Sequence, residues 1–132
     1  MGKGPANETG LVAAIRRELN KAYPDHWSIK THGNPYQDAG LPDLLICVEG
    51  LLIGMEVKFL RPGETREHAT GRITPQQKNQ LQKINEAGGM ADMVISTEEA
   101  LELIVRGFIK QRHLVAQRER ELAGDDDDST GG

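Results

Sequence analysis

The chain has 132 residues, 37% of them hydrophobic and 27% charged, which suits one ordinary globular domain with a sheet and a few helices. No apolar run approaches the roughly 18 residues of a membrane span, no apolar export signal lies near the first residue, and the single Cys47 cannot form an internal disulfide. We therefore expect a soluble, cytoplasmic protein. The formal charge of −4 equals that of the four aspartates at 125–128, so net charge neither supports nor excludes a nucleic-acid partner.

The first predicted element is an amphipathic helix over residues 8–22, because apolar side chains recur there at helical spacing with basic residues on the other side. The segment WSIKTH at 27–32 then alternates apolar and polar residues, which predicts a half-buried strand with Trp27 and Ile29 on its inner face. A loop rich in turn-forming residues, GNPYQDAGLP, leads from this strand to Asp43.

The strongest local pattern in the sequence is a β-hairpin. Two apolar runs, DLLICV at 43–48 and LLIGMEVKF at 51–59, are separated by Glu49 and Gly50, the length of a tight two-residue turn. Both faces of each run are apolar, so we expect helices to cover the sheet on both sides, as in an α/β architecture.

In the second half of the chain, the polar segment 60–73 predicts a mobile surface loop. A helix is expected within 74–89, where a threonine caps its start and two glycines end it. A short buried strand at 91–96 and a helix over 98–108 follow. These elements predict an α/β domain over 1–122, with a mixed sheet of about four strands and the order α-β-β-β-α-β-α. The last residues, 123–132, cannot bury anything and are expected to form a disordered acidic tail.

Three charged residues lie inside the apolar hairpin. If Glu49 and Gly50 are the two turn residues, Asp43 lies directly opposite Glu56, and Lys58 projects from the same face two residues later. Two opposed carboxylates destabilise a sheet unless something compensates for them, and a divalent cation is the natural compensation. The hairpin therefore predicts a metal site with a cationic neighbour.

The chemistry that this site predicts is hydrolysis of a phosphodiester. Mg²⁺ prefers oxygen ligands and is commonly held by one or two carboxylates together with substrate phosphate oxygens, so Asp43 and Glu56 supply the minimum set, and the carbonyl of Val57 lies between Glu56 and Lys58 to complete it. Lys58 can orient the attacking water or stabilise the transition state. A Glu-x-Lys pair alone is more often a solvated ion pair, but here both strands are apolar, where charges without a function are costly.

These residues resemble the virus-type replication-repair nuclease (VRR-NUC) domain of the PD-(D/E)xK nuclease superfamily. The resemblance runs from about Glu8 to Glu99 and includes ETGLVAAI, GLPDLLICVEG, MEVKF, TPQQKNQL and VISTEEAL. It implies a restriction-endonuclease-like fold with metal bound by Asp43 and Glu56 (Mg²⁺ or Mn²⁺) and Lys58 as the catalytic lysine. It also implies a homodimeric, structure-specific DNA endonuclease acting on branched or Holliday-junction DNA, encoded by a bacterium or a phage.

The same resemblance gives roles to two peripheral residues. Gln77 in TPQQ would be the catalytic helix glutamine, although its position three residues after Thr74 also fits a helix capping box, and the two roles are compatible. Glu8 would be an acid of the first helix that contributes to the metal site, although an acid in a first helical turn is also favoured by the helix dipole alone.

Candidate DNA contacts lie near these residues. Lys30 and His32 fall on the strand before the hairpin, and Gln76 and Lys78 flank Gln77 near a helix start, where phosphate is readily bound. His26 and His32 lack a third ligand at sensible spacing, so a surface or DNA-contact role is favoured over a transition-metal site.

Two charged segments near the end of the sequence each allow two interpretations. The run from Arg112 to Arg120 is either a solvated helix face or a DNA-binding extension. The aspartate tail either maintains solubility or competes with DNA for the basic surface.

We therefore expect a Mg²⁺- or Mn²⁺-dependent endodeoxyribonuclease. A non-catalytic nucleic-acid-binding or regulatory module with the same fold, and a nuclease acting on RNA, are the alternatives.

Overall fold

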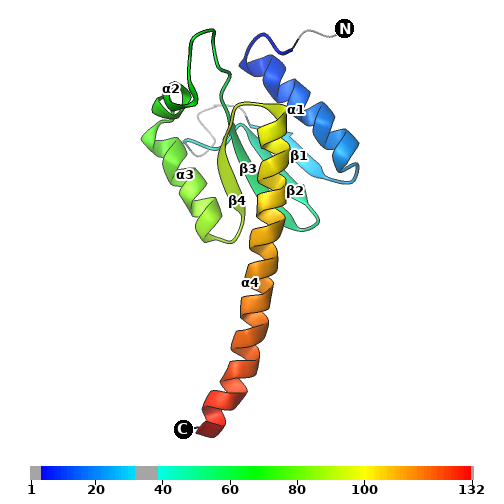
Figure 1. Ribbon diagram of the computed structural model, residues 1–132, viewed down its shortest axis with the longest axis vertical. Coiled ribbons are helices and arrows are strands. Elements are labelled where there is room, and N and C mark those ends of the chain that lie inside the picture. Colours follow the sequence, from blue (N-terminus) through cyan, green and yellow to red (C-terminus); the bar gives the residue numbers. More distant parts are fainter. Residues whose placement is uncertain (1–3, 32–38, 132) are drawn as a thin grey trace.

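The computed structural model describes residues 4–31 and 39–131, with side chains up to Gly124. A sheet with helices packed against it forms the body of the protein, and the last helix extends well beyond that body (Figure 1). The elements are, in chain order, α1 (Glu8–Ala22), β1 (Trp27–Lys30), β2 (Leu44–Val48), β3 (Leu51–Val57), α2 (Arg66–Gly71), α3 (Pro75–Glu86), β4 (Met90–Val94) and α4 (Thr97–Gly131).

The four strands form one mixed sheet in the order β1-β2-β3-β4. β1, β2 and β3 pair antiparallel to one another, and β4 pairs parallel to β3. A parallel neighbour requires a crossover connection, which α2 and α3 supply between β3 and β4. The expected mixed four-stranded α/β sheet is confirmed.

The hairpin of β2 and β3 has the predicted two-residue turn. Val48 pairs with Leu51, and Leu44 pairs with Met55 four positions further along the strands. Glu49 and Gly50 both have positive φ, 50° and 81°, as the tightest hairpin turns require. The predicted register is therefore the observed one.

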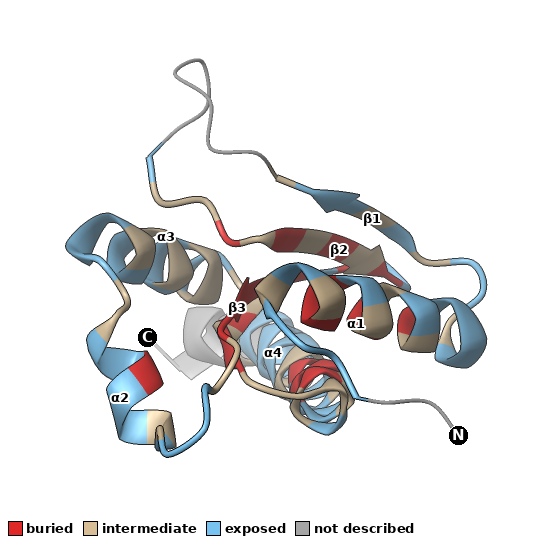
Figure 2. Cartoon of the chain, turned by 90° about the horizontal axis from the view of Figure 1, so that it is seen from above, coloured by how far each residue is buried: buried red, intermediate tan, exposed pale blue. Residues whose placement is uncertain are grey.

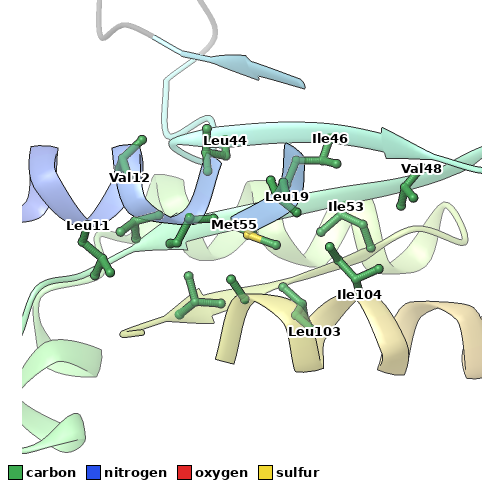
Figure 3. Packing of buried hydrophobic residues seen from close by; sticks show 14 of the residues in the cluster. Leu11, Val12, Leu19, Leu44, Ile46, Val48, Ile53, Met55, Leu103 and Ile104 are labelled. Carbon is green, nitrogen blue, oxygen red and sulfur yellow. The ribbon is translucent and has the colours of Figure 1, made fainter. Parts of the chain in front are cut away.

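One face of the sheet carries the hydrophobic core. Leu44, Ile46, Ile53 and Met55 are each 0% exposed and project between the sheet and helices α1 and α4 (Figure 3). The helices contribute the other half of the core, with Leu11, Val12, Ile15 and Leu19 from α1 and Ala100, Leu103 and Ile104 from α4. Helix α1 begins where predicted, with Asn7 as its N-cap.

The other face of the sheet is only partly covered. Helix α3 packs over β3 and β4, but Trp27, Ile29 and Leu52 are 53%, 41% and 41% exposed (Figure 2). The expectation that both faces are covered therefore holds for the β3–β4 half, and the expectation of a half-buried 27–32 strand is wrong for Trp27 and Ile29. Its alternation is real, but β1 is an edge strand whose outer face no described element covers.

A short helix, α2, lies within the segment expected to be a mobile loop. Thr65 caps it, accepting a hydrogen bond from the N–H of His68, whose ring nitrogen accepts one from the N–H of Thr65. Histidine in place of the usual Glu or Gln hid this capping box in the sequence.

Helix α4 extends through residues 123–131, which the sequence analysis expected to be disordered. Extending an existing helix needs no new nucleus, because each added residue gains one hydrogen bond. The division into a domain at 1–122 and a separate tail stays a prediction. No helix that the structure describes combines the length and apolarity needed to cross a membrane.

We predict that Gly107→Val destabilises the fold by about 1–3 kcal/mol, the usual cost of overpacking a core. A Cβ atom at Gly107 would lie 2.8 Å from Leu51 Cδ2 and 2.9 Å from Ile53 Cδ1, where α4 crosses the sheet. Urea unfolding measures the loss, with Gly124→Val as the control, because no heavy atom lies within 4 Å of a Cβ there. Equal stability of the two variants would contradict this packing.

Candidate active site

Asp43 lies at the open end of the β2–β3 hairpin, next to Glu56. It immediately precedes β2, so it stands one position beyond the Leu44–Met55 pair. Its Oδ2 accepts a hydrogen bond of 2.7 Å from the N–H of Val57, and its backbone carbonyl accepts one of 2.9 Å from the N–H of Thr31. Both neighbouring strands therefore hold Asp43 in place.

Glu56 and Lys58 follow on the same face of β3 and its continuation, and both are buried. Glu56 is 1% exposed and Lys58 9% exposed, and they are the only buried charged residues among those that the structure describes. Lys58 Nζ lies 3.6 Å from Glu56 Oε1. The other carboxylate oxygen, Glu56 Oε2, is buried without a hydrogen-bond partner in the described part of the chain. Such an orphaned oxygen is expensive to bury unless a ligand binds it.

Gln77 reaches this cluster from the first turn of α3. Its Nε2 donates a hydrogen bond of 2.8 Å to Glu56 Oε1. Its Oε1 accepts one of 2.8 Å from the N–H of Thr74, whose hydroxyl accepts in turn from the N–H of Gln77. The expected capping box of Gln77 is therefore confirmed, and the same side chain contacts Glu56, while its catalytic role stays a prediction.

Gly40 positions the start of α3, a function that the sequence analysis did not assign. Its φ is +82°, and a Cβ atom there would clash with the backbone carbon of Gln76 and lie 2.6 Å from the N of Gln77. The loop before Asp43 thus packs directly on the backbone that carries Gln77. Glycine in a turn was the available signal, but only the tertiary contact shows why no side chain fits.

Burial dominates the electrostatics of the two carboxyls. It raises the pKa of Glu56 from its ordinary 4.5 to about 8, helped by the negative charge of Asp43 and opposed by Lys58. Burial also raises the pKa of Asp43, although the N–H of Val57 and the ammonium of Lys58 lower it. Without a cation, burial and the charge of Asp43 therefore favour the protonated form of Glu56 at neutral pH.

The donor set fits a hard divalent cation. Asp43 and Glu56 offer carboxylate oxygens, and the backbone of Val57 lies between Glu56 and Lys58. Among the described residues no group of three His, Cys, Asp or Glu side chains is gathered in a metal-binding arrangement, so Glu8 is not brought together with the pair. Its role as a ligand stays a prediction, and substrate oxygens or waters would have to supply the remaining positions.

The contacts of Lys30, His32, Gln76 and Lys78 with DNA stay predictions. Lys30, Gln76 and Lys78 are exposed, and His32 lies outside the described residues. The His26 ring bonds to the Tyr23 carbonyl at 2.7 Å and to the Ser28 hydroxyl at 3.2 Å, joining the end of α1 to β1. His26 therefore has a local structural role.

The comparisons with known proteins bear on the fold. One solved structure, described as a "VRR_NUC domain", matches with probability 1.00, a TM-score of 0.51 and 22% sequence identity, over 75% of this chain and 96% of the matched chain. No protein-family model matches the sequence, and no curated protein matches it. The chain therefore has the fold of a VRR-NUC domain, as the sequence motifs led us to expect.

We predict that Glu56→Gln weakens the pH dependence of stability in the absence of metal. The pKa of Glu56 is higher in the folded than in the unfolded chain, so the fold favours its protonated form. The stability that this preference contributes to the folded state is fully present below about pH 4.5 and is lost as the pH rises through about 8. Urea unfolding in EDTA between about pH 5 and 8.5 measures this loss. An equal fall in wild type and Glu56→Gln would contradict the burial of an ionisable Glu56.

A second prediction concerns Gly40→Ala, which should destabilise the protein by about 1–3 kcal/mol through its clash with the α3 backbone. The matched control is Gly63→Ala, because Gly63 has the same φ of +82° but open space around it. Both variants carry the strain of a left-handed backbone, about 1–2 kcal/mol, so their difference in urea unfolding isolates the contact with α3. If the two variants are equally stable, Gly40 does not position α3.

Proposed function

We propose that the chain is a metal-dependent nuclease of the VRR-NUC type that hydrolyses phosphodiester bonds in DNA. One observation carries the proposal: Asp43, Glu56, Lys58 and Gln77 converge at one end of the sheet, with one carboxylate oxygen of Glu56 buried and unpartnered among the described residues. The VRR-NUC fold of the chain supports it.

Each residue has a role that follows from its contacts. Asp43 and Glu56 would hold a divalent cation, because they are the two carboxylates at the open end of the β2–β3 hairpin. Gln77 donates to Glu56 Oε1, which leaves Oε2, unpartnered among the described residues, as the oxygen that would bind the cation. Lys58 Nζ lies 3.6 Å from Glu56 Oε1 and would stabilise negative charge developing on a phosphate.

A bound cation supplies Lewis-acid chemistry, neutralising phosphate charge and promoting the ionisation of water. In the hydrolysis, a water oxygen would attack phosphorus and release a proton to solvent, while the bond from phosphorus to the leaving oxygen breaks and that oxygen takes up a proton from solvent. Lys58 is the only charged donor within the buried part of the cluster that the structure describes, so it is the residue that we propose to orient the water or to stabilise the leaving charge.

The substrate and assembly are part of the same proposal. One chain carries one such site, and cutting both strands of a branched duplex or a Holliday junction needs two sites, which a two-fold symmetric homodimer supplies. Mg²⁺ or Mn²⁺ is the proposed cofactor, because the donors are oxygens.

The same fold without catalysis, as a nucleic-acid-binding module, explains the site less well. A binding module has no need for two adjacent buried carboxylates, which repel phosphate and cost stability through desolvation. The buried Lys58 would also be unnecessary for binding, because surface lysines provide that attraction at lower cost.

We predict that Lys58→Met lowers cleavage by about 10²–10⁴-fold, the usual contribution of a positioned acid–base or electrostatic group. The assay follows labelled single-stranded, duplex, flapped and four-way-junction DNA with Mg²⁺, Mn²⁺ or EDTA. Lys83→Met is the matched control, because Lys83 is an exposed lysine of α3.

Mg²⁺ should also raise the melting temperature of the wild type but not of Asp43→Asn, since a ligand that binds only the folded state stabilises it. Metal-dependent cleavage that Lys58→Met retains in full would contradict the assigned site. Binding without cleavage of any DNA or RNA would favour the non-catalytic module.

A further inference from the structure

A groove with a volume of about 410 Å³ lies between helix α1 and the edge strand β1. Its lining residues come from α1 and β1, and α1 lies on the opposite side of the sheet from α3 (Figure 2). Its polar lining comes from both elements: Thr9, Arg16, Arg17 and Asn20 of α1, and Ser28 and Lys30 of β1.

The groove concentrates positive charge. Arg16, Arg17 and Lys30 all line it, and no acidic residue does. None of the three cations forms an ion pair with an acid in the ranges 4–31 and 39–124, where side chains are described. The nearby Glu18 is engaged with Lys21, at 3.4 Å. Three like charges in one groove repel one another unless an anion binds among them.

The donors in this groove are typical of phosphate recognition. Arginine, lysine, serine, threonine and asparagine side chains make most protein contacts to the phosphates and sugars of nucleic acids. The arginine fork in particular matches two phosphate oxygens at once. A membrane surface fits less well, because membrane-binding surfaces combine basic residues with protruding apolar ones, and the exposed Trp27 and Ile29 lie on the opposite face of β1 from Ser28 and Lys30.

The groove also leads to the candidate active site. Lys30 is the last residue of β1 and pairs with Leu44, the first residue of β2. The next residue, Thr31, donates its N–H to the backbone carbonyl of Asp43 at 2.9 Å. A polymer bound along Arg16, Arg17 and Lys30 therefore arrives at this end of the sheet on the α1 side, and it must pass around that end to reach Asp43 and Glu56 on the α3 side.

We propose that the groove between α1 and β1 binds the phosphodiester backbone of a nucleic-acid strand and guides it to Asp43 and Glu56. This inference rests on the proposed nuclease function for its last step, since the strand must end at a site that cleaves it. Arg16 and Arg17 are binding residues in this proposal and take no part in the chemistry.

The test compares Arg16→Ala/Arg17→Ala with Lys83→Ala/Arg106→Ala, which removes two positive charges outside the groove. Arg106 is exposed and forms only a long ion pair of 3.5 Å with Asp92. Binding of fluorescein-labelled single-stranded and duplex DNA is measured in EDTA between 50 and 300 mM salt, and far-UV circular dichroism checks that each variant is folded. Cleavage by the wild type is measured separately with Mg²⁺ and Mn²⁺.

The groove variant should bind DNA about tenfold or more weakly at 100 mM salt, and its plot of log K against log salt should be shallower by about 2, one unit for each lost phosphate contact. The control should keep the wild-type slope.

Equal slopes and affinities in all three proteins would overturn the groove as a nucleic-acid site, and wild-type cleavage would still support the nuclease. An equal loss of binding to a polyglutamate peptide would make the groove a general anion site and would also overturn the proposal. A groove-dependent slope without any cleavage would support the groove and contradict the proposed nuclease instead.

Discussion

The register of β2 against β3 is the constraint on which the candidate site depends. The turn at Glu49 and Gly50 sets that register, and a slip of one residue would turn every side chain of one strand to the opposite face. In the observed register, Leu44, Ile46, Ile53 and Met55 all face the core, and a slip of β3 by one residue would put Gly54 and Glu56 in the place of two of them. The apolar face of the hairpin therefore enforces the pairing that brings Asp43 next to Glu56 on the other face.

Because strand residues alternate between faces, one segment serves two purposes. Met55 and Val57 are fully buried against α1 and α4, while Glu56 between them faces α3 and is also buried. The cost of desolvating Glu56 appears as its raised pKa, and only a well-packed core on the opposite face offsets such a cost in a chain of this size. A surface location would have removed that cost, but it would also have weakened the electrostatic interactions at the site.

Local patterns predicted what depends on neighbours in the sequence. Residue spacing, turn residues and caps determine the first helix, the hairpin with its register, and the capped start of α3, so the sequence predicted all three. Features that depend on long-range contacts could not be predicted in this way. The exposure of Trp27 follows from the place of β1 at the sheet edge, and the need for glycine at position 40 follows from the backbone of α3, far along the chain. The opposition of Asp43 and Glu56 could be derived from the hairpin alone, whereas the bond from Gln77 to Glu56 required α3 to be placed.

The identity of residue 77 shows how helix stability and the candidate site are reconciled. Both Glu and Gln can accept the hydrogen bond that closes a capping box, and the helix dipole additionally favours the negative charge of Glu at a helix N-terminus. At Gln77, however, the end of the side chain also contacts Glu56. The N–H of Thr74 donates to Gln77 Oε1, and an amide has donors only on its other atom, so Nε2 is directed at the carboxylate. Glutamate would present an acceptor there and add a third negative charge beside Asp43 and Glu56. Glutamine is the residue that caps α3 and donates a hydrogen bond to Glu56 at the same time.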